Sequence, residues 1–271
     1  MINNLKRLKG VYFPNKNPNK KGPYGDKNDY RELSIQAQQI DTTLVDNFCN
    51  KLGYSIDLNY FENLALYTQV VKKNSPLNYQ HGKVLYSLLS KYISENSNLK
   101  NIHILETGTA RGFSSICMSK ALNDRNIEGT IFTIDFLPHE KAIYWNCISD
   151  FEGKKSRKDL LNQWKKERDN IEFLTGKTSK ILKNLKIERI NFAFLDGAHL
   201  EKAVLKEYNF IFPKQVQGDI IVFDDVNKNI FPGVYEAIKQ IQKSKVYSFE
   251  FMNLDENRKI AIATRNKGIK D

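Results

Sequence analysis

Two short motifs in the second half of the chain combine side chains that could do chemistry. One is Asp-Gly-Ala-His at residues 196–199 and the other is the pair Asp224-Asp225; each directly follows an apolar run. Carboxylate oxygens are hard ligands, so they suit Mg²⁺, Mn²⁺ or Ca²⁺ better than zinc. A divalent ion held by Asp196, Asp224 and Asp225 would lower the pKa of a bound hydroxyl group and make its oxygen nucleophilic.

His199 could act on the proton of the same hydroxyl group. It follows Asp196 by three residues, about one turn if a helix has started there. An imidazole can serve as a general base near neutral pH. Plain structural interpretations compete with both roles: His199 as an ordinary residue at a helix start, and the aspartate pair as a solvated helix cap. The sequence favours metal binding by the aspartates and leaves the role of His199 evenly open.

A glycine turn stands earlier in the chain. The apolar run 102–105 ends in Glu106, the turn that follows contains Gly108 and Gly112, and a helix is expected from residue 113 onward. A strand, a glycine turn and a helix form the first unit of a nucleotide-binding α/β fold. Glycine lets the backbone take a positive φ and approach a ligand, and the helix presents free N–H groups to that ligand.

Asp135 ends the next predicted strand, residues 129–135. An ionised carboxylate only accepts hydrogen bonds, so it can accept one from each of the two hydroxyl groups of a ribose. A solvated strand end or a helix cap is the alternative. Because the glycine turn precedes this strand, we favour ribose binding by Asp135.

These motifs need a framework that brings strand ends together. Strand-like and helix-like stretches alternate, which predicts a doubly wound, mainly parallel Rossmann-like α/β sheet with a C-terminal antiparallel hairpin. Ligands bind such sheets beyond the carboxyl ends of the strands. Five acids would meet at that edge and repel one another unless cations or hydroxyl groups satisfy them. They are Glu106, Asp135, Asp196, Asp224 and Asp225. The predicted strands are 102–106, 129–135, 171–176, 190–195, 219–223, 247–252 and 259–264.

The residues before the sheet are expected to cover this edge. Residues 1–30 are polar and contain Pro, Gly and Asn, which predicts an irregular arm. We expect residues 31–80 to form a helical cover and residues 81–271 to form the main domain. That domain carries a long insertion, 138–168, whose second half is predicted to be an amphipathic helix. Apolar spacing places helices at 33–52, 60–73 and 82–94.

Composition limits which cellular compartment and which partners we expect for the protein. The 271 residues are 41% hydrophobic and carry a net charge of +11, which is enough apolar content for one large α/β domain with an N-terminal addition. The lysines are spread along the chain, so nucleic acid is not favoured as the main partner. No apolar run approaches the ~20 residues that span a bilayer, and no secretory signal is evident. Three widely spaced cysteines form neither a disulfide framework nor a zinc motif. We expect a cytoplasmic protein without a membrane partner, and a homo-oligomer remains open.

Three segments carry a family resemblance. ETGTARGFS at 106–114, FLDGAHLEKAVLKEY at 194–208 and GDIIVFDDV at 218–226 resemble the class I S-adenosylmethionine-dependent methyltransferases, and the resemblance extends over residues from about 80 to 265. The Asp-Gly-x-His and Asp-Asp elements are similar to the branch of metal-dependent O-methyltransferases that act on small molecules, including sugars of natural products. The catechol-type branch has Asp-Asn where this chain has Asp224-Asp225.

The resemblance implies S-adenosyl-L-methionine as cofactor, Mg²⁺ (or Mn²⁺ or Ca²⁺) as the metal, and a small-molecule or sugar acceptor. It implies Asp196 and His199 as catalytic residues and Asp196, Asp224 and Asp225 as metal ligands. Lys177 departs from the family pattern, in which many members carry an acid, and this weakens an adenine contact there. The implied cofactor-binding residues are Glu106, Gly108, Thr109, Gly112, Phe113, Ser114, Asp135, Phe136, Thr178 and Asp196.

Three other classes are weaker alternatives. A short-chain NAD(P)-dependent dehydrogenase would explain part of the glycine turn and the Tyr-x-x-x-Lys at 235–239, but Ser114 replaces its third glycine and no serine lies between Ser179 and Ser244. A nucleic-acid methyltransferase would share the cofactor site, but amino-methylating members often carry Asn/Asp-Pro-Pro-aromatic where this chain has residues 196–199. A non-catalytic relative would be expected to have lost the strand-end acids.

Overall fold

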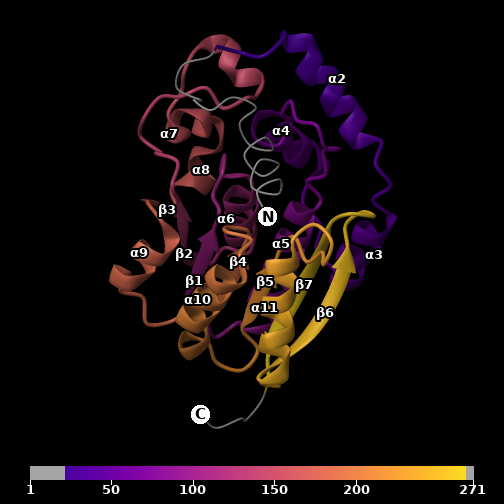
Figure 1. Cartoon of the computed structure of the whole chain (residues 1–271). Helices are drawn as coiled ribbons and strands as arrows, with labels where there is room; N and C mark the ends of the chain where they lie inside the picture. The colour runs from indigo at the N-terminus through magenta and orange to yellow at the C-terminus, as the bar shows by residue number, and fades with distance from the viewer. Residues whose placement is uncertain (1–21, 267–271) are drawn as a thin grey trace.

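A seven-stranded sheet forms the centre of the computed structural model, which describes residues 22–266 (Figure 1). Most of the predicted arm 1–30 therefore lies outside the described residues. The strand order is β3-β2-β1-β4-β5-β7-β6; the first five strands pair in parallel, and β6 and β7 form an antiparallel hairpin at the edge. The predicted fold is confirmed. The strands are β1 (Asn101–Thr107), β2 (Glu128–Asp135), β3 (Ile171–Thr175), β4 (Phe192–Leu195), β5 (Ile220–Phe223), β6 (Tyr247–Asn253) and β7 (Lys259–Arg265).

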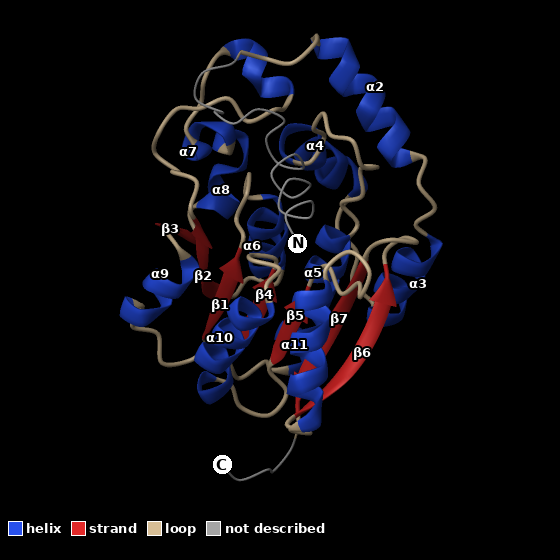
Figure 2. Cartoon of the chain, in the orientation of Figure 1, coloured by secondary structure: helices blue, strands red, loops and turns tan. Residues whose placement is uncertain are grey.

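Two hydrophobic cores lie on opposite faces of the sheet. Successive side chains of a strand point to opposite faces, so Ile104 and Phe194 enter the core that contains α5 and α6, whereas Leu105 and Leu195 enter the core with α10 and α11. Helices on both faces explain why β4 and β5 are apolar at every position. Figure 2 shows α9, α10 and α11 in front of the strands. The helices are α5 (His81–Glu95), α6 (Phe113–Asp124), α9 (Thr178–Asn184), α10 (Glu201–Ile211) and α11 (Pro232–Lys243).

Three further helices precede the sheet, and their bounds differ from the prediction. The first begins at Lys27, inside the expected arm, because the Asp26 side chain caps it by accepting from two backbone N–H groups. The helix expected over 33–52 is broken, because Asp41 accepts hydrogen bonds from the N and Oγ1 of Thr43 (2.9 and 2.6 Å) and so starts a new helix. The three are α2 (Lys27–Gln38), α3 (Thr43–Leu52) and α4 (Leu58–Thr68).

The insertion 138–168 contains short turns of helix in place of the single amphipathic helix that was predicted. Its apolar residues Leu160, Leu161 and Trp164 are all buried, as the pattern required, but a 3₁₀ turn at Asn162–Trp164 interrupts the helix between them. The turns are η1 (Ile148–Glu152), α7 (Arg157–Leu160), η2 (Asn162–Trp164) and α8 (Lys165–Arg168). In Figure 1 this segment and α2 and α4 lie beyond the carboxyl ends of the parallel strands.

None of the helices between residues 22 and 266 has the length and apolar character that crossing a membrane requires.

Candidate active site

The carboxyl ends of β1, β4 and β5 bring the predicted site residues to one edge. In the sheet register Thr107 is paired with Leu195, and Leu195 is paired with Phe223. Asp196 and Asp224 directly follow these paired residues, so both acids emerge at the same level. The shared strand end that the sequence predicted is therefore present.

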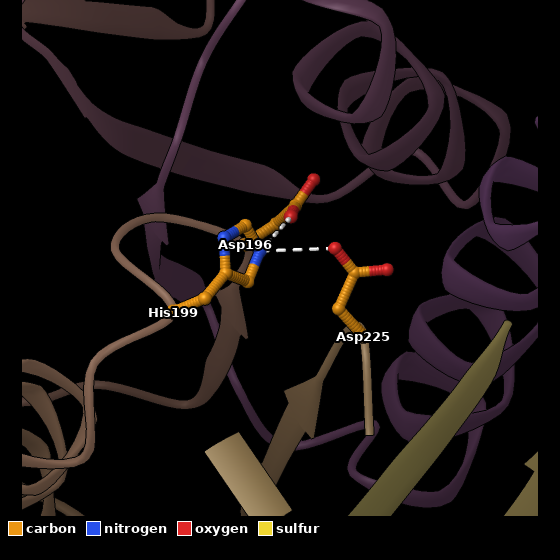
Figure 3. Close-up of side chains that lie close together, drawn as sticks. All are labelled: Asp196, His199 and Asp225. Carbon is orange, nitrogen blue, oxygen red and sulfur yellow. Dashed lines mark ion pairs between the residues drawn. The ribbon is translucent and has the colours of Figure 1, made fainter. Parts of the chain in front are cut away.

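Asp196, His199 and Asp225 form a compact group at this edge (Figure 3). One potential ligand atom from each lies within 4.8 Å of the others. His199 Nε2 is 2.9 Å from Asp225 Oδ2 and 3.6 Å from Asp196 Oδ1. Asp225 has a φ of 56°, which turns the chain away from the direction of β5.

The electrostatics of this group favour a cation between the two carboxylates. Burial and the nearby charge of Asp224 raise the pKa of Asp196 to about 7. Burial alone would lower the pKa of His199, but the carboxylates of Asp196 and Asp225 raise it to about 10. His199 Nε2 is paired with the Asp225 carboxylate, and the buried Asp196 Oδ1 faces the same nitrogen at 3.6 Å. Two carboxylates and an imidazole that converge in this way are ligand types that suit a divalent ion.

Asp224, a predicted metal ligand, is paired with an arginine in this structure. Its carboxylate is buried and forms an ion pair with Arg258, whose Nε donates to Oδ1 at 3.2 Å. Burial disfavours the charged carboxylate, but the Arg258 guanidinium lowers the pKa of Asp224 below its usual value. In this structure His199, and not Asp224, is grouped with Asp196 and Asp225, and Asp224 is neutralised by an arginine; the metal ligands themselves stay a prediction.

Arg258 is the residue at this edge that sequence reasoning missed. It lies in the turn between β6 and β7, and its Nη1 also donates to the carbonyl oxygen of Asn78 at 2.7 Å. The sequence offered no signal for it, because it stands in an ordinary polar turn whose partner is 34 residues away.

The glycine turn lies directly against the acidic group. Gly108 has a φ of +93°, and a Cβ at that position would lie 2.0 Å from the backbone oxygen of Asp196. Its N–H donates to the carbonyl oxygen of Ile134 at 2.9 Å. Gly112, with a φ of +91°, directly precedes α6. Both glycines are therefore required for the backbone conformation of the turn. At Gly108 the turn also packs directly on the backbone of Asp196, which follows β4.

Several side chains expected to line the cofactor site point into the protein instead. Glu106 is fully buried and accepts hydrogen bonds from the hydroxyl groups of Ser114, Ser115 and Thr133. Burial raises the pKa of Glu106, and these hydroxyl groups oppose that shift. The Thr109 hydroxyl is buried against that of Thr133 at 2.5 Å. These groups hold the turn to the start of α6, so a ligand in the turn would meet mainly backbone.

Phe113 also faces inward, where its ring packs on those of Phe61 and His81, with centroid distances of 5.5 and 5.3 Å. Phe136 behaves in the opposite way: it follows β2, and its side chain is 75% exposed. Thr178 is half-buried at the first position of α9. Of these three predicted cofactor residues, the structure leaves Phe136 and Thr178 accessible and places Phe113 in the core.

Asp135 lies at the end of β2, beside the glycine turn. Its Oδ2 accepts from the N–H of Ala110 at 2.7 Å, and its Oδ1 accepts from the N–H of Leu137 at 2.8 Å. Burial raises the pKa of Asp135, and the charge of Arg157 opposes that rise. The predicted ribose ligand is thus next to the turn, with its carboxylate already oriented.

Comparisons with known proteins agree with this arrangement. Residues 105–226 match the family model described as a methyltransferase domain, a segment that includes the glycine turn, Asp135 and the triad of Asp196, His199 and Asp225. The sequence matches no curated protein.

Three solved structures have a similar fold. The O-methyltransferase TomG from Streptomyces achromogenes, in complex with SAM, is 16% identical with a TM-score of 0.54 over 78% of this chain and 92% of its own. Cofactor-bound Rv0187 from MTB is 17% identical, with a TM-score of 0.56 over 85% and 100%. An O-methyltransferase from Bacillus cereus in complex with SAH is 17% identical, with a TM-score of 0.51 over 87% and 100%. The segment that carries the site, residues 105–226, is thus similar to a methyltransferase domain, and the described chain shares its fold with these solved structures.

Proposed function

We propose that the protein transfers the methyl group of S-adenosylmethionine to a hydroxyl group of a small molecule, a sugar included, with help from a divalent ion. The observation that carries the proposal is the direct contact between the glycine turn and the group of Asp196, His199 and Asp225. The glycine turn, which would hold the cofactor, packs so tightly on Asp196 that only glycine fits at position 108. Asp196 in turn belongs to the group with His199 and Asp225. A methyl donor in the turn and an acceptor at the triad would therefore be neighbours.

The reaction follows from these residues. Asp196, His199 and Asp225 would hold a divalent ion, which supplies charge that lowers the pKa of the acceptor hydroxyl. The acceptor proton leaves to solvent water, because the three side chains of the triad would be occupied by the ion; the oxygen forms a bond to the methyl carbon, and the carbon–sulfur bond breaks. S-adenosylhomocysteine leaves with the electron pair on sulfur. The backbone of the glycine turn and Asp135 keep the donor in line with the acceptor oxygen, which accounts for much of the rate enhancement.

His199 serves this reaction only in its neutral form. With both carboxylates charged, the pKa of His199 is about 10, so near neutral pH the ring is protonated and cannot take another proton. A cation bound to Asp196 and Asp225 would neutralise the negative charge of the same carboxylates and repel the proton on His199 Nε2. Proton and divalent ion thus compete for one position.

The acceptor site we propose is a cavity of about 640 Å³ between α2 and the segment before α5. Lys73 lies in its wall, and the charges of Asp225 and Arg258 both act on the Lys73 ammonium group, whose pKa burial lowers to about 8. The cavity therefore adjoins the charged edge of the sheet. Most of its lining residues carry a polar group that could bind a hydroxylated molecule; the lining is Tyr24, Asp29, Glu32, Leu33, Gln36, Lys72, Lys73 and Asn74.

Transfer of radiolabelled methyl groups tests the proposal. The wild-type protein is incubated with labelled S-adenosylmethionine and a panel of phenols, sugars and nucleotide sugars, with Mg²⁺ or with EDTA. We expect Mg²⁺-dependent labelling of a hydroxylated acceptor and a loss of about a hundredfold or more in Asp225→Asn. Asp255→Asn, in the turn before Arg258, is the control and should keep its activity. Labelling that is equal in Mg²⁺ and EDTA would contradict the role of the metal.

Calorimetry of metal binding tests the competition with the proton. Mg²⁺ titrated at about pH 8 in two buffers of different ionisation enthalpy should release about one proton from the wild type. His199→Gln should release almost none. Equal release from both proteins would show that His199 does not share the site.

A further inference from the structure

The insertion 138–168 reaches the cofactor edge through one buried arginine. Arg157, the first residue of α7, is 1% exposed. Its Nε donates to the carbonyl oxygen of Ala110 in the glycine turn at 2.9 Å. Its Nη2 lies 3.5 Å from Asp135 Oδ2 and has no hydrogen-bond partner among residues 22–266. An arginine from a separate segment thus contacts both the turn and the predicted ribose ligand.

The surroundings hold this guanidinium in place. Arg157 lies over the rings of Trp145 and Phe173, at 5.4 and 5.7 Å from their centroids. Its backbone N–H donates to the carbonyl oxygen of His139 at 2.9 Å. Burying a guanidinium is costly unless it is paired and hydrogen-bonded. Fold packing alone gives little reason for such a group here, because an apolar side chain could fill the same space.

Arg157, Ala110 and Asp135 form a closed ring of contacts. Arg157 binds the carbonyl oxygen of Ala110, the N–H of Ala110 binds Asp135 Oδ2 at 2.7 Å, and Asp135 faces Arg157 again. Ala110 takes a φ of 46°, which is unusual for a residue with a side chain. The ring therefore holds the turn in an unfavourable backbone conformation and fixes its position relative to the carboxylate.

We propose that Arg157 is a positioning residue for the ribose of the adenosyl cofactor: it locks the glycine turn and Asp135 into one unit, so that the ribose hydroxyl groups meet a carboxylate of fixed orientation. This inference rests on the proposed function, because it needs an adenosyl ligand in the turn. It also gives the insertion a role, which is to complete the cofactor site from outside the sheet.

Arg157 would also keep Asp135 charged. The groups that act on Asp135 are the Arg157 charge and the N–H groups of Ala110, Phe136 and Leu137, all of which oppose the effect of burial on its pKa. Of the other charges near the ring, those of Glu106 and Arg111 act on Arg157, and burial together with the Arg157 charge lowers the pKa of His139. Without Arg157, the buried carboxylate would bind a proton more readily and lose acceptor capacity.

A ligand series separates positioning from a general structural role. Calorimetry gives the affinities of 5′-methylthioadenosine and its 2′,3′-dideoxy analogue for wild type and Arg157→Gln. The wild type should lose at least about tenfold in affinity when the two hydroxyl groups are removed. Arg157→Gln should lose less than about threefold, because its ribose contact is already weakened. A purely structural role would weaken both ligands equally and leave the ratio unchanged, which would overturn the inference.

The pH profile gives a second readout. In Arg157→Gln, affinity for S-adenosylhomocysteine should fall more steeply than in the wild type as the pH is lowered from about 8, because Asp135 takes up a proton more readily without the Arg157 charge. Arg157→Lys keeps the charge and should restore the wild-type profile with weaker binding. Arg168→Gln is the matched control, because Arg168 is a buried arginine of the same insertion whose Nη1 binds the carbonyl oxygen of Lys158.

The outcomes distinguish a failure of the proposed function from a failure of the role proposed for Arg157. If the wild type binds no adenosyl ligand, the proposed function fails and the inference fails with it. If the wild type binds and Arg157→Gln shows the wild-type ribose ratio and the wild-type pH profile, only the role of Arg157 fails. Should Arg157→Gln not fold, as thermal unfolding would show, Arg157→Lys decides: an unchanged ribose ratio and unchanged affinity would overturn the inference.

Discussion

Asp224 and Asp225 are neighbours in the chain, yet their nearest partners differ. Asp224 is buried and pairs with Arg258, whereas Asp225 leaves the strand with a φ of 56° and lies 2.9 Å from His199 and 3.8 Å from Arg258 Nε. The positive φ turns the second carboxylate away from the first, so the two acids divide their roles. One stabilises the hairpin turn that covers the site, and the other is available to a ligand.

Replacing Arg258 should cost stability at this point. In Arg258→Gln the Asp224 carboxylate, which is 1% exposed, loses its counter-charge, so we expect the free energy of unfolding to fall by about 3–5 kcal/mol. Denaturant unfolding measures the change. The double variant Arg258→Gln/Asp224→Asn should recover part of the loss, because it removes the uncompensated charge. A single variant as stable as wild type would mean that the pair contributes little.

His199 makes the stability of the metal-free protein depend on pH. Its pKa is about 10 in the folded protein against an ordinary value of 6.5. The folded state therefore binds one proton more than the unfolded state between these values, so the free energy of unfolding should fall as the pH rises through that window, by roughly 1–3 kcal/mol. Urea unfolding at a series of pH values measures this. His199→Gln should flatten the dependence, and an equally steep decline in that variant would contradict the assignment.

At the scale of elements, the glycine turn and β4 depend on one close approach. Gly108→Ala would add a Cβ 2.0 Å from the Asp196 oxygen, at a φ of +93°. We expect it to lose measurable binding of S-adenosylhomocysteine and a few kcal/mol of stability, because backbone would have to move. Gly218→Ala is the matched control: its φ is +86°, but nothing lies within 4 Å of the added atom. The control should lose only about 1 kcal/mol and bind normally. Equal effects in both variants would assign the loss to backbone strain alone.

The elements were predictable where a local pattern specified them. Apolar runs located every strand of the sheet, and the strand-end acids indicated the site edge, because both signals lie within a few residues. The helix over 33–52 was predicted as one piece, because the break between α2 and α3 depends on the hydrogen bonds that the Asp41 side chain accepts from Thr43. The insertion was predicted as a helix from Leu160, Leu161 and Trp164, which are buried as expected but lie on interrupted turns.

Partners distant in sequence could not be predicted. Glu106 was expected to face the cofactor, but it binds Ser114 and Ser115 from α6 and Thr133 from β2. The pairing of Asp224 with Arg258 likewise joins β5 to a turn 34 residues away. Such contacts depend on how the elements pack, and a single sequence contains no record of that packing.

At the scale of the whole molecule, Asn146 links three segments that surround the site. Its Oδ1 accepts from the Tyr30 hydroxyl of α2 at 3.0 Å and from the N–H of Lys72 at 3.2 Å, and its Nδ2 donates to the Lys72 carbonyl at 2.9 Å. Asn146 itself belongs to the insertion. The helical cover, the segment beside the proposed acceptor cavity and the insertion are therefore connected at one side chain.

Breaking this link should loosen the cover as a unit. We expect Asn146→Ala to lower the free energy of unfolding by about 2–3 kcal/mol, because three hydrogen bonds are lost and a buried hydroxyl is left without a partner. Tyr30→Phe removes only one of these bonds and should cost about 1 kcal/mol. Hydrogen exchange should show faster exchange in α2 in Asn146→Ala than in Tyr30→Phe. Identical exchange in α2 in both variants and wild type would rule out the proposed linkage.

Binding of the product cofactor tests the central claim most directly. S-adenosylhomocysteine is titrated into the wild-type protein in a calorimeter, once with Mg²⁺ and once with EDTA, with Gly108→Ala as the negative control. The structure predicts one-to-one binding in both conditions, since neither the glycine turn nor Asp135 contributes a side chain to the triad, and no binding to Gly108→Ala. Absence of binding to the wild type in both conditions, with NADPH binding instead, would contradict the assignment of this sheet edge to methyl transfer.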